Sequence, residues 1–293
     1  MQSLWMVLAS LLFALMGVCV KLASAVFTTS EIVMYRGLFG VIFLFSLSRI
    51  HAISLKTTMP LRHLGRGMVG VTALWMWFYT IGRLPLAMAN TLNYMSPIWI
   101  AAILFGWNWW YGKSRLHWKL PCAIMLSFVG VILLLQPSVS KAQLPFALIA
   151  LCSGMLAALA YLQVRTMGLM GEPETRVVFY FSLTSAIWGA IVALIDHDWH
   201  MPDQRQIVLL SLVGLFASTA QLAMTRAYRL GNPLLTANLS YSGIVFSSVL
   251  GALVWQDTIS WLSWVGIAII MISGILATYL HTTSTLAMAA EKI

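Results

Sequence analysis

The stretch PLAMANTLNYMSPIWIAAILFGWNWW, residues 85–110, decides the fold, because its pattern returns later in the chain as PLLTANLSYSGIVFSSVLGALVW, residues 233–255. Each copy contains more than twenty residues, most of them apolar. At about 1.5 Å per residue, a helix of this length crosses the roughly 30 Å hydrocarbon core of a bilayer. Both copies are therefore predicted to span a membrane.

One register relates the two copies. LNY at residues 92–94 falls on LSY at residues 239–241, an offset of 147 residues (241 − 94 = 147) in a chain of 293. Because this offset is close to half of the chain length, the sequence predicts two repeats. We place them at residues 1–141 and 142–293.

The composition is that of an integral membrane protein. Apolar residues make up 60% of the chain and charged residues only 9%, with a mean hydropathy of +0.88. So little charge cannot cover the surface of a soluble globule of this size. The net charge of +9 is then a property of loops beside a lipid bilayer, and no nucleic-acid partner is expected.

Apolar runs separated by polar breaks predict about ten membrane spans. Their approximate limits are residues 4–25, 30–49, 66–83, 86–108, 119–136, 145–165, 176–195, 206–227, 233–254 and 259–280. The runs are long and continuous, whereas barrel strands alternate over about ten residues. The expected fold class is therefore an all-α integral membrane protein with about ten transmembrane helices.

The basic residues indicate the orientation, because cytoplasmic loops carry an excess of lysine and arginine. With both termini in the cytoplasm, twelve basic residues fall on the inner side and four on the outer side. The inner residues are Arg49, Lys56, Arg62, Arg66, Lys113, Arg115, Lys119, Arg165, Arg176, Arg226, Arg229 and Lys292; the outer ones are Lys21, Arg83, Lys141 and Arg205. Both termini are therefore predicted to be cytoplasmic.

Five spans per repeat is an odd number, so the second repeat is predicted to enter the membrane upside down relative to the first. Inverted repeats commonly form a substrate site near the bilayer midplane, between the halves, and expose it to the two sides in turn. This architecture indicates transport. No glycine-rich phosphate loop is present, so no nucleotide or other cofactor is expected.

YRGLFG at the start of the second span, with LPLA and YMSPI of the fourth span, resembles EamA-like members of the drug/metabolite transporter superfamily. The resemblance covers essentially the whole chain. It implies a ten-helix secondary transporter of small organic metabolites in a bacterial inner membrane, and no enzymatic activity. Such proteins usually carry a glutamate just after the fourth and ninth helices; this chain has Asp257 in the second copy and Trp109-Trp110 in the first.

Polar side chains inside spans are the candidate substrate contacts, because they are costly in hydrocarbon unless they face a cavity or another helix. On the fourth span, Asn90, Asn93 and Tyr94 share one face with Pro97. Pro97 removes a backbone hydrogen bond, so a kink is expected there. The asparagines either bind substrate or hold helices together by interhelical hydrogen bonds of about 0.6–2 kcal/mol.

The ninth span offers matching candidates, Asn238 and Tyr241. Tyr94 and Tyr241 are related by the repeat and are predicted to face one cavity from opposite sides. The alternative is that both tyrosines anchor the helices at the membrane interface.

The third and eighth spans contribute Trp75, Tyr79 and Gln221. Trp75 and Tyr79 are four residues apart and share a face, and Trp75 falls opposite Gln221 in the repeat alignment. The alternative is an aromatic stripe that faces lipid. Tyr161 and Gln163 on the sixth span are weaker candidates.

Arg36 lies beside Tyr35, about six residues or roughly 9 Å inside the second span. Its side chain either snorkels outward toward Glu31 or faces a cavity. In a cavity, its planar fork would bind a carboxylate or phosphate. Tyr35 is a further candidate and can be set against Tyr180 of the seventh span.

No aspartate or glutamate lies deep in any predicted span, so export of hydrophobic cations in exchange for protons is disfavoured. The expected function is export of small organic metabolites, such as amino acids or related zwitterionic or anionic solutes, by alternating access. The alternative is a membrane-embedded enzyme or lipid-handling protein that uses the histidine-rich outer loop, residues 196–200. No metal site is expected there, because such clusters in short loops are usually solvated.

Overall fold

The computed structural model describes residues 2–110, 119–135, 140–196, 199–231, 236, 239–257 and 260–290. Every regular element in these residues is a helix, which confirms the all-α fold class. The elements are η1 (Gln2–Leu4), α1 (Trp5–Ala23), α2 (Thr29–Ile50), α3 (Pro60–Ile81), α4 (Leu86–Asn93), α5 (Ser96–Trp110), α6 (Lys119–Leu135), α7 (Leu144–Leu169), α8 (Glu174–Asp196), α9 (Gln204–Leu230), α11 (Ser242–Trp255) and α12 (Trp261–Ala290).

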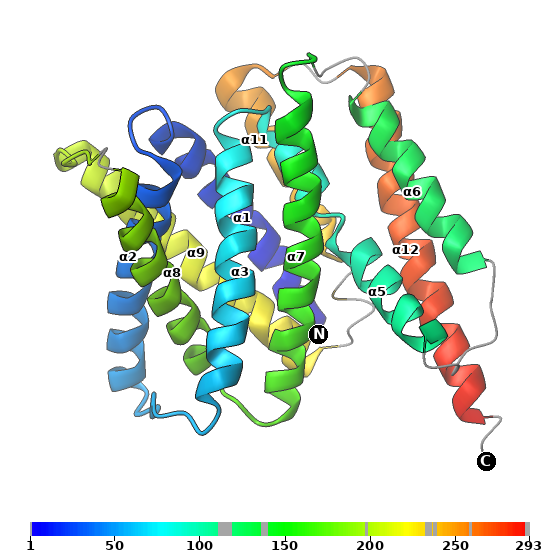
Figure 1. Ribbon diagram of the computed structural model, residues 1–293, viewed down its shortest axis with the longest axis horizontal. Coiled ribbons are helices and arrows are strands. Elements are labelled where there is room, and N and C mark those ends of the chain that lie inside the picture. Colours follow the sequence, from blue (N-terminus) through cyan, green and yellow to red (C-terminus); the bar gives the residue numbers. More distant parts are fainter. Residues whose placement is uncertain are drawn as a thin grey trace.

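The helices form a long bundle (Figure 1). α2 and α8 lie at one end, α5, α6 and α12 lie at the other, and α1, α3, α7 and α9 lie between them. The most extensive contacts join α2 to α8, α6 to α12, α1 to α9 and α3 to α7. Each of these pairs joins a helix of the first half of the sequence to a helix of the second half.

Side chains and prolines at the helix starts explain where several helices begin. α2 and α9 start with capping boxes. The side chains of Thr28 and Asp203 accept a hydrogen bond from the backbone N–H of the residue three positions later. The side chains of those residues, Glu31 and Gln206, accept one from the backbone N–H of Thr28 and Asp203. Proline stands in the first turn of α3 and α7. There its missing N–H costs nothing, because the first helical N–H groups have no intrahelical partner.

The fourth predicted span is broken into α4 and α5 at Tyr94 and Met95. Pro97 has no N–H group to donate to the carbonyl of Asn93 one turn earlier, so the helix stops and restarts, and Pro97 lies in the first turn of α5. α7 passes this break at Gly154, where a Cβ would lie only 2.8 Å from the carbonyl oxygen of Leu92. In the similar stretch at residues 233–255, a turn at Tyr241, the residue aligned with Tyr94, separates the helical residues 239–240 from α11.

Five helices of the described chain are long and apolar enough to cross a membrane: Gln2–Ala23, Thr29–Ile50, Leu144–Leu169, Glu174–Asp196 and Gln204–Leu230. Ser242–Trp255 and Trp261–Ser273 are shorter apolar helices. The other predicted spans correspond to α3, which carries Arg66, to the broken pair α4 and α5, and to α6.

Small residues allow α2 and α8 to pack closely. A Cβ on Gly189 would lie 2.5 Å from the backbone nitrogen of Met34, and a Cβ on Gly40 would lie 2.7 Å from the hydroxyl of Ser182. A Cβ on Gly37 would overlap the backbone of Ala186. Such small-residue contacts bring two backbones together, as is common between membrane helices.

One buried carboxylate fastens each end of the α2–α8 pair. At the start of α2, Glu31 is fully buried and accepts from the backbone N–H groups of Thr28 (2.7 Å) and His200 (2.6 Å). The Nδ1 atom of His200 lies 3.3 Å from the same carboxylate. The start of α2 is thus held by the segment that precedes α9.

At the opposite end, Glu172 lies just before α8 and is also buried. Its carboxylate accepts from Thr57 Oγ1 at 2.7 Å and from Arg176 at 2.9 Å, and lies 2.7 Å from His63 Nε2. Arg176 further donates to the carbonyl of Ser54 at 2.8 and 3.0 Å. The start of α8 is thus held by the segment that precedes α3.

Glu172 makes the stability of this end dependent on pH. Burial alone would raise the pKa of Glu172, but hydrogen bonds from His63 and Thr57 and the charge of Arg176 together hold that pKa below its ordinary value. Because the folded-state pKa is lowered, the stabilisation is present above the unfolded-state pKa and is lost as the pH falls through the folded-state value.

We therefore expect Glu172→Gln to lower Tm at neutral pH and to converge with the wild type in acid, below about pH 4. Thermal unfolding of the purified protein between neutral and acidic pH measures this. Thr57→Val is the matched control, since it keeps the carboxylate and removes one donor, and is expected to show an intermediate pH dependence. Parallel curves for the wild type and Glu172→Gln would contradict this assignment.

Candidate functional site

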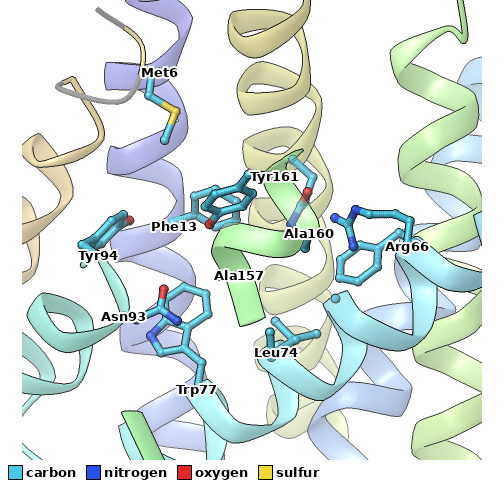
Figure 2. A pocket seen from close by; sticks show the side chains of 14 residues that line it. Met6, Phe13, Arg66, Leu74, Trp77, Asn93, Tyr94, Ala157, Ala160 and Tyr161 are labelled. Atoms are coloured by element: carbon cyan, nitrogen blue, oxygen red, sulfur yellow. The ribbon is translucent and has the colours of Figure 1, made fainter. Parts of the chain in front are cut away.

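A small cavity lies in the middle of the bundle, between helices of both sequence halves (Figure 2). Its polar wall is made by Arg66, Asn93, Tyr94, Tyr161 and Gln221, and its apolar wall includes Met6, Phe13, Leu74, Trp77 and Phe181. Its volume is about 40 Å³, which is enough for roughly three water molecules. A larger solute requires the walls to move apart.

Arg66 is the charged residue of this wall, and sequence reasoning missed it by placing it in the inner flank of the third span. The structure places it inside α3 with only 3% of its surface exposed. Figure 2 shows it on one side of the cavity, with Tyr94 and Asn93 on the other. The signal that could have found it is Pro60, because proline at a first helical position would have moved the predicted start of the helix six residues earlier.

The Arg66 guanidinium is held by apolar contact. Its central carbon lies 4.2 Å from the centre of the Phe181 ring, and its Nε and one terminal nitrogen have no hydrogen-bond partner. Gly70 leaves room for it, since a Cβ there would overlap the guanidinium. The group is thus positioned without an anion of the described chain.

Arg36 contacts the same ring. Its guanidinium carbon lies 4.7 Å from the centre of Phe181, and one terminal nitrogen donates to the hydroxyl of Ser185 at 3.2 Å. It is 1% exposed and does not line the cavity. The alternative of a snorkelling contact with Glu31 is not seen, because that carboxylate is held by Thr28 and His200.

The acidic side chains in the described part of the chain have other partners. Asp257 lies 3.6 Å from Lys21, Glu174 accepts from Arg229 at 2.8 Å, and Asp196 accepts from Ser30 at 3.5 Å. Asp203 caps α9, and Glu31 and Glu172 fasten the ends of the α2–α8 pair. Within the described residues, the guanidinium of Arg66 therefore has no carboxylate partner, and an unpaired buried charge of this kind is costly.

The two asparagines of α4 differ. Asn90 accepts from Trp77 Nε1 at 2.8 Å and donates to Ser247 Oγ at 2.6 Å, so it joins α3, α4 and α11. Asn93 donates to Ser153 at 2.9 Å and also lines the cavity. The contacts of Asn90 are those expected of an interhelical link.

Tyr94 and Tyr241, which the predicted repeat relates, are both buried. Tyr94 lines the cavity, and its hydroxyl has no hydrogen-bond partner. Its ring fills the space beside Gly243, where a Cβ would lie 2.5 Å from the phenol oxygen. Tyr241 is 1% exposed, also has an unpartnered hydroxyl, and is not part of this cavity wall. Asn238 lies outside the described residues.

Of the remaining predicted residues, some line the cavity and others lie elsewhere. Gln221 lines the cavity, together with Tyr161. Trp75 stacks on Tyr79 at 5.2 Å and donates to Ser30 at 3.3 Å, away from the cavity wall. Tyr35 lies near the Glu31 end of α2, 6.2 Å from Trp199. A role of Trp75, Tyr79 and Tyr35 in substrate binding stays a prediction.

The cavity thus has one polar and one apolar wall and lies between helices of both sequence halves. A match to the EamA-like transporter family covers residues 1–136 and 144–279. The chain belongs to this family. As an EamA-like transporter it is a membrane protein and not an enzyme, so the alternative function for the outer loop is not supported.

Curated relatives of this EamA-like transporter carry different solutes. The pseudopaline exporter CntI of Pseudomonas aeruginosa is 28% identical over 255 residues, covering 86% of each chain. A riboflavin transporter of Rhizobium johnstonii is 28% identical over 240 residues, covering 77% of this chain and 74% of the relative. An S-adenosylmethionine uptake transporter of Rickettsia bellii is 21% identical over 209 residues, covering 70% and 67%. Small-metabolite transport is common to them.

The fold is also found in a solved crystal structure with a TM-score of 0.70. That chain is 17% identical, and the superposition covers 95% of this EamA-like transporter and 98% of the other chain. The likeness supports the arrangement of the helices.

The link through Asn90 can be measured by a double-mutant cycle. We expect Asn90→Ala and Ser247→Ala to destabilise non-additively, with a coupling of about 0.6 kcal/mol and at most about 1.7 kcal/mol. Unfolding of the purified single and double variants measures this. Ser248→Ala is the matched control, because Ser248 donates to Ile244 within its own helix, and its combination with Asn90→Ala is expected to be additive. Equal coupling in both cycles would contradict the link.

Proposed function

We propose that this protein is a secondary transporter that exports small organic metabolites, namely amino acids or related zwitterionic or anionic solutes, by alternating access. The observation that carries the proposal is the central cavity, which has an arginine in its wall and a second arginine behind Phe181. Asn93, Tyr94 and Gln221 supply polar contacts, and Arg36 adds positive charge. This environment favours solutes that bear an acidic group.

Alternating access requires two halves that can rock, and the helix pairing supports two inverted repeats. If residues 1–141 and 142–293 are repeats, then α2 corresponds to α8 and α6 to α12, and each of these helices packs on its own counterpart. The contact of α1 with α9 has its counterpart in the contact of α3 with α7. A twofold axis in the membrane plane accounts for all four pairs.

The two fastened ends support the same repeat. Glu31 at the start of α2 is bound by the segment before α9, and Glu172 at the start of α8 is bound by the segment before α3. Tyr35 and Tyr180, which the repeat relates, lie at these two ends: Tyr180 donates to the carbonyl of Leu55 at 3.1 Å, and Tyr35 lies beside Trp199.

Counterflow in proteoliposomes tests the function. Vesicles are loaded with an unlabelled amino-acid mixture and diluted into a trace of the same radiolabelled mixture. A carrier is expected to accumulate label transiently, because it exchanges internal for external substrate. Protein-free vesicles are the control. Equal uptake by both kinds of vesicle would count against carriage of amino acids.

Tyr94 and Tyr241 are expected to act in this transport. Tyr94→Phe and Tyr241→Phe remove unpartnered hydroxyls, so we expect unchanged or higher Tm with an exchange rate at least about tenfold lower if the hydroxyl binds solute. Tyr279→Phe is the control, since Tyr279 is exposed on α12. Normal exchange by both Tyr94→Phe and Tyr241→Phe would leave the two tyrosines with a packing role.

The orientation also gives a prediction. Leu61 and Met201 are 81% and 82% exposed, at the start of α3 and before α9. If both termini are cytoplasmic, Met201→Cys is expected to react with a membrane-impermeant thiol reagent in intact cells, whereas Leu61→Cys is expected to react only after lysis. The native cysteines are replaced by serine in both variants. The reverse labelling pattern would invert the topology.

A further inference from the structure

We infer that Arg66, with Arg36 behind it, is the residue that binds the acidic group of the transported solute, and that this group is a carboxylate. The inference deepens the proposed function and rests on it. Arg66 was identified only from the structure, and its place in the cavity wall gives it a role that Arg36 cannot fill.

The chemistry of Arg66 indicates an anion as its missing partner. A guanidinium has five N–H donors and no acceptor, yet its Nε and one terminal nitrogen are buried without a hydrogen-bond acceptor. Phe181 contacts its central carbon at 4.2 Å, and this contact satisfies no N–H group. A buried donor set of this kind costs free energy until an acceptor enters the cavity.

The rest of the wall indicates what kind of anion fits. Arg66 is the charged group among the lining residues, and Tyr161, Gln221, Asn93 and Tyr94 are neutral. One guanidinium matches the charge of one carboxylate, and its planar fork matches a carboxylate in shape. A dianionic phosphate would leave charge unpaired in this wall. The apolar side of the cavity is suited to the carbon skeleton of the same solute.

Arg36 is a positioning residue. Its guanidinium packs on Phe181 at 4.7 Å and is tied to Ser185, and it does not line the cavity. It therefore fixes the ring on which Arg66 rests and adds positive potential without touching the solute. Loss of Arg36 is expected to weaken anion binding, and loss of Arg66 to abolish it.

Acetate and acetamide are the probes that test the site. Acetate is a carboxylate small enough for a cavity of about 40 Å³, and acetamide has nearly the same shape without the charge. We compare Tm of the purified wild type in each at about 0.2 M, at matched ionic strength, because stabilisation grows with the ratio of ligand concentration to Kd. Acetate is expected to raise Tm by about 3 °C relative to acetamide. Equal values of Tm would overturn the inference.

The variants assign the effect to Arg66. Arg66→Met is expected to abolish the acetate shift and to raise Tm without ligand by about 2 °C or more, because it removes an unpaired buried charge. Arg36→Met is expected to retain a reduced shift. The assignment of the site to Arg66 would be overturned if Arg66→Met kept the full shift of Tm in acetate. It would also be overturned if Arg36→Met lost that shift and Arg66→Met did not.

Gly70 provides a test that leaves Arg66 in place. Gly70→Ala puts a methyl group where the guanidinium lies, whereas a Cβ on Gly65 of the same helix meets nothing within 4 Å. We expect Gly70→Ala to lose at least half of the acetate shift and Gly65→Ala to keep it. Equal shifts in the two variants would show that the position of the guanidinium does not matter.

The outcomes separate this inference from the proposed function. An acetate shift that depends on Arg66, in a protein that shows no counterflow, would preserve the anion site and remove the transport proposal for amino acids. Counterflow that continues at the wild-type rate in Arg66→Met would preserve transport and overturn the anion site.

Discussion

The close contact between α2 and α8 is the constraint on which the centre of the structure depends. Between lipid-embedded helices there is little hydrophobic driving force, so association relies on van der Waals contact and hydrogen bonds. Gly37 and Gly189 allow the two backbones to come into direct contact, and Gly40 leaves room for the side chain of Ser182. That approach brings Arg36 within hydrogen-bond distance of Ser185 and against Phe181. A bulkier residue at any of these glycines would separate Arg36 from Ser185 and Phe181.

The two arginines on Phe181 show how a membrane bundle can hold positive charge without an internal carboxylate. Each guanidinium contacts the face of an aromatic ring, which attracts a cation but does not saturate its donors. The described acids are occupied elsewhere, chiefly at the ends of helices. The fold therefore tolerates an unfavourable local arrangement at its centre, as proteins commonly do at functional sites.

Much of the fold was predictable because long apolar runs specify membrane helices, and Pro97 specified the break in the fourth span. The pairing of α1 with α9 was not predictable, because periodicity within a helix does not identify its neighbour. Site prediction was less complete for a similar reason. Asn93, Tyr94 and Gln221 were found as intramembrane polar groups, whereas Arg66 was lost because hydropathy alone set the start of its helix. The contacts of Asn90 with Trp77 and Ser247 depend on three helices meeting and leave no trace in the local sequence.

The two buried carboxylates have a mechanical consequence. Glu31 and Glu172 hold opposite ends of one helix pair, and each is bound by a segment of the other half of the chain. If the hydrogen bonds of one carboxylate break, the helix pair can rotate about the end that the other carboxylate holds. A helix of 22 residues, such as α2, is about 33 Å long at roughly 1.5 Å per residue. A rotation of about 5° about one end therefore moves the other by roughly 3 Å, close to the width of a water molecule. Both pivots of such a rotation would belong to the same pair of helices.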